Sequence, residues 1–192
     1  EIYTLSLHDA LPISFAKRLA EATDALQVGN GMTDGVEQGP IIDDQGLAKI
    51  KQHVEDAVGK GATLLTGGKP HALGGTFFEP TVLTEMTSDM QLFREETFGP
   101  VAALFKFSDE DDAIAMANDS EFGLAAYLFT ENAARLFRVS EALEFGIVAV
   151  NTGIFSSEVG PFGGLKNSGL GREGSKYGID EFLEIKFVCV GM

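Results

Sequence analysis

Helix-patterned and strand-patterned segments alternate along residues 15–151, and this order constrains the fold more than any other feature of the sequence. Apolar residues recur at helical spacing in residues 15–29, 42–61, 109–118 and 131–143. Short apolar runs predict strands at residues 62–68, 77–86, 100–107, 124–130 and 146–151. These runs are apolar on both faces, which is typical of strands covered by helices on both sides. We therefore expect an α/β fold with a mostly parallel sheet and flanking helices.

Two predicted strands differ from the others. Residues 77–86 contain Pro80, which lacks the N–H needed for a ladder hydrogen bond, so an edge strand or an irregular strand is expected there. Residues 181–190, EFLEIKFVCV, alternate in polarity more cleanly than the other runs. This alternation predicts a final strand that lies at a sheet edge or pairs with another chain.

The charge and the cysteine content limit the kinds of partner and the cell compartment expected for this protein. The 192 residues include 14 Lys and Arg against 29 Asp and Glu, a formal net charge of −15. Phosphate binding needs a positive surface, so this balance argues against a nucleic-acid or anionic-membrane partner. The single cysteine, Cys189, excludes an internal disulfide and fits a reducing compartment. We see no signal peptide and no apolar run near the roughly 20 residues of a membrane span, so a cytoplasmic location is expected.

The first 14 residues, EIYTLSLHDALPIS, differ from the rest of the chain. They show no clean helical or strand period, and a well-patterned helix is predicted directly after them. The string resembles the translated read-through of a sequencing adapter, and we expect residues 1–14 not to belong to the fold. An irregular native arm is the alternative.

Most isolated reactive residues have an ordinary structural explanation. The three histidines lie far from any second His or Cys at ligand spacing, so no metal site is expected. GLGREG at residues 169–174 matches a dinucleotide fingerprint in form, but it follows a loop and has no complete βαβ unit after it. Cys189 lies in an apolar stretch without a base or helix N-terminus beside it, which favours a buried structural thiol over a nucleophile.

The stretch EETFGP at residues 95–100 contains two adjacent carboxylates. Neighbouring residues of an extended segment point to opposite sides. Glu95 and Glu96 therefore cannot easily share a proton across a substrate, as paired catalytic carboxylates must. At most one of them faces a given site.

Several motifs together resemble the aldehyde dehydrogenase superfamily. EETFGP is followed by NDSEFGLAAYLFT, GIVAVNTG and PFGGLKNSGLGREGSKYG, in the order and spacing of that superfamily. The resemblance covers about residues 15–192 and is greatest to succinate-semialdehyde dehydrogenases, with glutarate-semialdehyde dehydrogenases close. It implies a catalytic-domain part at residues 15–175 and an oligomerisation tail at 176–192 that joins subunits into a dimer or tetramer.

The resemblance also implies roles for individual residues. Glu96 would accept hydrogen bonds from the nicotinamide ribose of NAD or NADP, and Phe98 would pack near the nicotinamide. Lys49 falls where the family approaches the cofactor ribose. For the aldehyde substrate, the resemblance implies a tunnel lined by Phe162, and Ser156 or Ser157 contacting the distal carboxylate of a semialdehyde.

The main departure from the family pattern is the absence of the expected nucleophile. Family chemistry runs through a cysteine thiolate a short way before residues 15–22, where this chain has no cysteine. The general-base glutamate and the cofactor domain are expected further upstream. We therefore expect a C-terminal fragment that is inactive alone, with no catalytic residue of its own. A non-catalytic oligomerisation module remains an alternative, as does an unrelated acid/base enzyme built on the glutamate pair.

Overall fold

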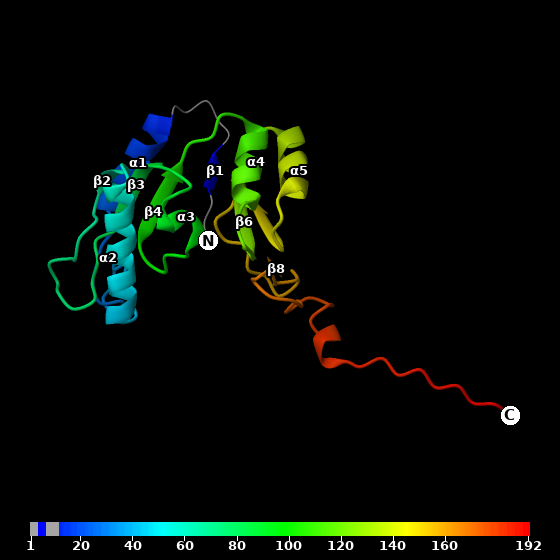
Figure 1. The fold of residues 1–192 in the computed structure, drawn as a ribbon. Coiled ribbons are helices and arrows are strands. Elements are labelled where there is room, and N and C mark those ends of the chain that lie inside the picture. Colours follow the sequence, from blue (N-terminus) through cyan, green and yellow to red (C-terminus); the bar gives the residue numbers. More distant parts are fainter. Residues whose placement is uncertain (1–3, 7–11) are drawn as a thin grey trace. The chain divides into compact units, whose positions relative to one another are not determined.

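The computed structural model describes residues 4–6 and 12–192, which form two compact units (Figure 1). One unit comprises residues 12–106, and the other joins residues 4–6 to residues 107–192. Residues 1–3 and 7–11 of the N-terminal stretch lie outside the described residues. Each unit is a mixture of helices and small sheets, in agreement with the predicted α/β class.

The unit of residues 12–106 contains a three-stranded sheet of order β2-β3-β4, in which β2 is antiparallel and β4 is parallel to β3. Helix α1 packs on β2 and β3. The elements are α1 (Pro12–Asp24), α2 (Asp44–Gly59), β2 (Thr63–Thr66), β3 (Thr81–Met86), α3 (Gln91–Arg94) and β4 (Val101–Phe105). Helix α1 ends five residues before Gly29, where we predicted its stop.

Helix α2 (Asp44–Gly59) lies within residues 42–61, which the sequence predicts as helical, and is two residues shorter at each end. The Asp43 side chain accepts a hydrogen bond from the Gly46 N–H, which caps the first turn. The buried face then follows the helical period through Leu47, Ile50, Val54 and Ala57. These side chains share a core with Leu83 of β3 and its neighbours, so α2 is fixed firmly to the sheet.

Strand β3 corrects the edge prediction made from Pro80. The strand begins at Thr81, directly after the proline, so no ladder hydrogen bond is lost and β3 lies in the centre of its sheet. The Thr81 N–H instead donates to the Pro100 carbonyl. The expected irregularity is confirmed, because the register with β4 shifts between Leu83 and Met86, and Glu85 has a φ of 56°.

The second unit contains a parallel three-stranded sheet of order β1-β6-β7 and a separate antiparallel pair, β5-β8. Helices α4 and α5 pack against each other, and α5 also contacts β6 and β7. The elements are β1 (Thr4–Ser6), α4 (Glu110–Asn118), β5 (Phe122–Gly123), β6 (Ala125–Phe129), α5 (Ala133–Ala142), β7 (Ile147–Val150), β8 (Leu165–Lys166) and the 3-10 helix η1 (Asp180–Phe182).

Helix caps and one ion cluster stabilise the helical layer of this unit. Asp109 accepts from the Asp112 N–H, and Asn132 accepts from the Arg135 N–H, at the starts of α4 and α5. The Glu110 carboxylate accepts from Arg135 Nε at 2.9 Å and from Arg138 Nη2 at 2.9 Å. This cluster links the first turn of α4 to α5.

The final strand predicted at residues 181–190 is not present in the isolated chain. The structure has η1 at Asp180–Phe182, and residues 183–192 form no strand. Their apolar side chains are exposed, with Ile185 fully accessible, and Figure 1 draws this segment as an extended trace. A strand needs a hydrogen-bonded partner, and the alternating pattern alone does not supply one. Among the described residues, no helix is both long enough and apolar enough to cross a bilayer.

Candidate functional site

The EETFGP loop joins α3 to β4 and is tightly constrained at its far end. The Gly99 N–H donates to the Thr97 carbonyl at 2.8 Å, and the Val101 N–H donates to the Gly99 carbonyl at 2.9 Å. A β-carbon at Gly99 would lie 2.3 Å from Cδ1 of Ile50 on α2. The loop therefore approaches α2 so closely that a side chain at residue 99 would collide with the core.

Glu95 and Glu96 have different surroundings. The Glu95 carboxylate reaches α2, with Oε2 lying 3.3 Å from His53 Nε2 and 3.9 Å from Lys49 Nζ. Glu96 is exposed. The structure thus agrees with the inference that the two acids do not act as one pair.

Two of the predicted cofactor residues, Glu96 and Phe98, lie two positions apart in the EETFGP loop, and the third, Lys49, lies on α2. Phe98 is 81% exposed, which is unusual for a phenylalanine and leaves its ring available to a ligand. Glu96 adds an exposed carboxylate two residues earlier, able to accept from a pair of hydroxyls. Lys49 pairs with Glu95 and not with Glu96, since its Nζ lies 3.9 Å from Glu95 Oε2.

The predicted substrate residues belong to the second unit, on the loop after β7. Phe162 stacks on Phe155, with ring centroids 6.4 Å apart and planes inclined by 15°. Phe155 also contacts Tyr127 of β6, at 5.5 Å between centroids. The three rings form a cluster that the structure defines and that the sequence did not indicate. Ser156 and Ser157 are exposed beside it.

Asn151 anchors the start of this loop. It has a φ of 54°, in the left-handed region where asparagine is tolerated. Its side-chain amide accepts from the Thr130 N–H and donates to the Thr130 carbonyl, each at 2.8 Å. The ends of β6 and β7 are thereby held together where the substrate loop begins.

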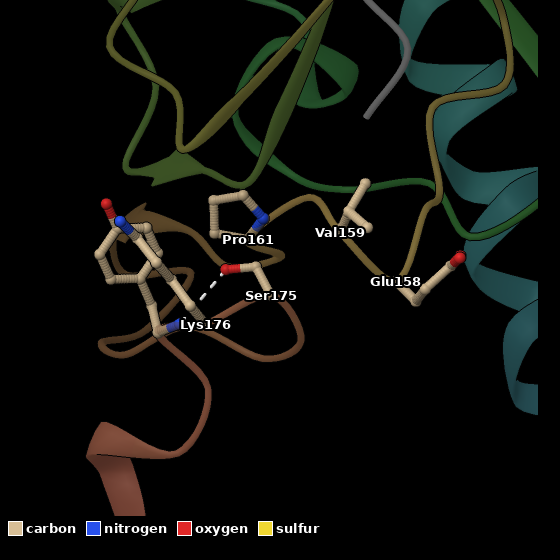
Figure 2. Close-up of a pocket in the computed structure, with 6 residues that line it drawn as sticks. Glu158, Val159, Pro161, Ser175 and Lys176 are labelled. Atoms are coloured by element: carbon tan, nitrogen blue, oxygen red, sulfur yellow. Dashed lines mark hydrogen bonds between the residues drawn. The ribbon is translucent and has the colours of Figure 1, made fainter.

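A shallow pocket of about 390 Å³ lies further along the same unit (Figure 2). The Ser175 hydroxyl accepts from the Tyr177 N–H across its floor, and the Ser175 N–H donates to the Glu158 carbonyl. The lining residues are Glu158, Val159, Pro161, Ser175, Lys176 and Tyr177. Ser156, Ser157 and Phe162 are not among them, so this pocket is not the predicted substrate site.

Two other groups bear on the chemistry. Within residues 4–6 and 12–192, no cluster of three or more His, Cys, Asp or Glu side chains could hold a metal ion. The predicted burial of Cys189 is wrong for the isolated chain, because the C-terminal tail of residues 183–192 forms no strand and the free thiol is exposed.

His53 is the site residue that the sequence analysis did not single out. It is fully buried, and both ring nitrogens have partners in the EETFGP loop. Its position between Ile50 and Val54, on the apolar face of α2, is a signal that could have identified it. A polar residue at a core position requires a hydrogen-bond partner.

Comparison with known proteins gives consistent matches. The Aldehyde dehydrogenase family matches residues 4–188. The NADP-dependent succinate-semialdehyde dehydrogenase of Escherichia coli is 53% identical over 188 residues, which is 98% of this chain and 39% of that protein. The glutarate-semialdehyde dehydrogenase of Pseudomonas aeruginosa is 54% identical over 97% of this chain and 39% of its own length. The 3-sulfolactaldehyde dehydrogenase of Pseudomonas putida is 54% identical, with 96% of this chain and 38% of that protein covered.

A solved structure matches equally well. The succinate-semialdehyde dehydrogenase of Burkholderia pseudomallei superimposes with a TM-score of 0.92 and 51% identity, covering 100% of this chain and 39% of that one. The chain therefore spans about 39% of the length of the relatives that it matches.

Proposed function

Because the chain belongs to the aldehyde dehydrogenase family, we propose that the protein containing it oxidises a semialdehyde to a carboxylate, with NAD or NADP as hydride acceptor. The relatives named above act on succinate semialdehyde, glutarate semialdehyde and 3-sulfolactaldehyde. All three names describe a small aldehyde with a second acidic group. The proposed substrate class is therefore an aldehyde with a distal anionic group.

The observation that carries this proposal is the division of roles in the EETFGP loop. Glu95 is half-exposed and contacts Lys49 and His53 of α2, whereas Glu96 and Phe98 are exposed two positions apart. A free carboxylate suits the vicinal hydroxyls of a ribose, and an accessible ring suits a planar nicotinamide. Lys49 would contribute positive charge near the same ribose. These residues would orient a nicotinamide nucleotide, and the bound nucleotide supplies the hydride-accepting ring.

The loop after β7 supports the substrate half of the proposal. Ser156 and Ser157 are exposed hydroxyls that can donate to a carboxylate or a sulfonate. Phe162 is held by stacking on Phe155, which would give the aldehyde chain an apolar wall of fixed orientation. Discrimination between the candidate substrates would depend on this wall and on the hydroxyls.

We further propose that these 192 residues alone do not catalyse the oxidation. The chain has one cysteine, and Cys189 is exposed in the tail. A nucleophilic thiol needs an electropositive surrounding or an adjacent base to form its thiolate. Oxidation of succinate semialdehyde by the isolated chain would contradict this proposal.

A second candidate is a subunit-association module. The tail of residues 183–192 favours it, because alternating apolar side chains are exposed there without a strand partner in the described chain. A strand-forming tail can complete the sheet edge of another subunit. The parent protein is accordingly proposed to be a homo-dimer or homo-tetramer.

A chimaera tests the enzymatic proposal directly. Residues 15–188 would replace the matching segment of the Escherichia coli relative, and reduction of NADP by succinate semialdehyde would be followed spectrophotometrically. We expect measurable turnover. Glu96→Gln should weaken NADP binding more than it lowers the maximal rate, because the neutral amide accepts ribose hydroxyls less strongly.

The matched control is Glu55→Gln, which removes the same charge from an exposed position of α2. It should leave both constants unchanged. A folded chimaera with no turnover for any of the three aldehydes would overturn the enzymatic assignment.

A further inference from the structure

His53 is a fully buried imidazole on the apolar face of α2. Its Nδ1 lies 2.6 Å from the Thr97 hydroxyl oxygen, and its Nε2 lies 3.3 Å from Glu95 Oε2. Both partners come from the loop that follows α3, more than 40 positions away in the chain. The ring therefore joins the helix to two residues of one short segment.

The chemistry of the partners fixes the ring hydrogen. An ionised carboxylate only accepts hydrogen bonds, so His53 Nε2 must donate to Glu95. In the neutral ring the other nitrogen is then an acceptor, and the Thr97 hydroxyl donates to Nδ1. In the neutral ring, these two contacts together require the hydrogen on Nε2.

The two residues held by His53 are the immediate neighbours of Glu96. In an extended segment alternate side chains share one side, and Glu95 has extended dihedral angles, with φ −108° and ψ 131°. Glu95 and Thr97 contact His53 of α2, although the Glu95 side chain stays 53% accessible, and Glu96 and Phe98 are exposed. The two predicted cofactor residues thus alternate along the chain with the two residues that contact His53.

Lys49 completes the anchor from the same helix. It lies one turn before His53, and its Nζ is 3.9 Å from the same Glu95 oxygen. Behind the loop, Gly99 is pressed against Ile50. Three residues of α2, Lys49, Ile50 and His53, therefore contact the loop on either side of Glu96.

We propose that His53 is a positioning residue of the cofactor site, which holds Glu95 and Thr97 so that Glu96 and Phe98 face the nicotinamide nucleotide. This inference rests on the proposed function for the role of Glu96. The anchoring itself does not depend on that function, so the two can fail separately.

Nuclear magnetic resonance of the 192-residue chain tests the anchoring. Long-range nitrogen–proton correlation should show the His53 hydrogen on Nε2. Thr97→Val keeps the side-chain shape and removes the hydroxyl, and it should speed amide exchange at Glu95 and Gly99 about fivefold, as expected for one lost hydrogen bond. His53→Gln should do the same, and the matched control, His71→Gln in the loop between β2 and β3, should not.

Two results would overturn the anchoring. One is a wild-type ring with its hydrogen on Nδ1. The other is unchanged exchange at Glu95 and Gly99 in Thr97→Val. Thr97→Val removes only a partly buried hydroxyl, so we expect this variant to fold. It therefore tests the anchoring even if His53→Gln does not fold.

The chimaera tests the consequence for the cofactor. Thr97→Val should raise the KM for NADP severalfold while kcat and the KM for the aldehyde stay within twofold. A purely structural role would instead lower the amount of active enzyme, and hence apparent kcat, with an unchanged KM for NADP. That second pattern would reject the positioning role even if the anchoring is found. An inactive chimaera would count against the enzymatic proposal, while the resonance measurements would still decide the anchoring.

Discussion

The side-chain amide of Asn151 forms a two-point hydrogen-bonded contact with the backbone of Thr130. The N–H and the carbonyl of Thr130 are both satisfied at 2.8 Å, and Asn151 has a left-handed φ of 54°. This pair connects the ends of two parallel strands, β6 and β7, directly before the loop that carries Ser156 and Phe162. Asn151 therefore fixes the position at which the candidate substrate loop leaves β7.

Replacement of Asn151 should destabilise the second unit. Asn151→Ala removes both hydrogen bonds and leaves a less tolerant residue at positive φ, so the expected loss is about 1–3 kcal/mol in the free energy of unfolding. Urea denaturation followed by circular dichroism measures it. Asn151→Gly relieves the backbone strain and loses only the hydrogen bonds, so its cost should be smaller. Equal stability of wild type and Asn151→Ala would contradict the anchoring role.

The Glu110 cluster predicts a pH-dependent contribution to stability. Hydrogen bonds from Arg138 and Arg135 lower the pKa of Glu110 from 4.5 to about 2. A carboxyl whose pKa is lower in the folded state stabilises the fold above its unfolded pKa, and that contribution is lost as the pH falls through the folded value. Glu110→Gln should therefore lower the melting temperature at pH 7, and the difference from wild type should shrink between pH 4.5 and pH 2.

The control for this series is Glu55→Gln, which removes an exposed carboxylate of α2. Its melting temperature should follow wild type at every pH. A difference between Glu110→Gln and wild type that stays constant down to pH 2 would show that the carboxylate charge is not the stabilising element.

The order of helices and strands was predictable because each signal is local. The Asp43 cap, the apolar face of α2 and the buried run of β7 can all be identified within one element. Pro80 did not predict the place of β3 in its sheet. A proline inside a strand removes a ladder hydrogen bond, but a proline one residue before the strand, as here, removes none. Residues 181–190 form no edge strand within the chain, because alternation describes a side-chain pattern whereas a strand also needs a partner, and pairing with another chain stays a prediction.

The candidate site was predictable only in part, for a similar reason. The divergence of Glu95 and Glu96 follows from backbone geometry between neighbours. The partnership of His53 with Thr97 joins residues 44 positions apart, and the tilted ring contact of Phe155 with Tyr127 also crosses between elements. No periodicity in the sequence encodes such contacts. They become visible only when the tertiary fold brings α2 to the loop and β6 to the segment after β7.

The contact between Gly99 and Ile50 predicts a coupled effect on stability. A methyl group at residue 99 would meet Cδ1 of Ile50 at 2.3 Å, so Gly99→Ala should cost about 1–3 kcal/mol through overpacking. Ile50→Val removes that terminal carbon, and Gly99→Ala should cost less in this background than in wild type. A double-mutant cycle by urea denaturation measures the coupling. Additive costs would show that the two residues do not restrict each other.

The C-terminal tail predicts self-association. Ile185, Phe187 and Val190 are at least 78% exposed, and an unpaired apolar strand-forming segment is a ready partner for another copy. The 192-residue chain should therefore sediment as oligomers, and a chain ending at Phe182 should shift towards monomer. Phe187→Glu should weaken association, because a charge would interrupt the apolar stripe. Lys186→Gln, its neighbour, is the control and should leave association unchanged, whereas a monodisperse wild-type monomer by light scattering at high concentration would refute this role for the tail.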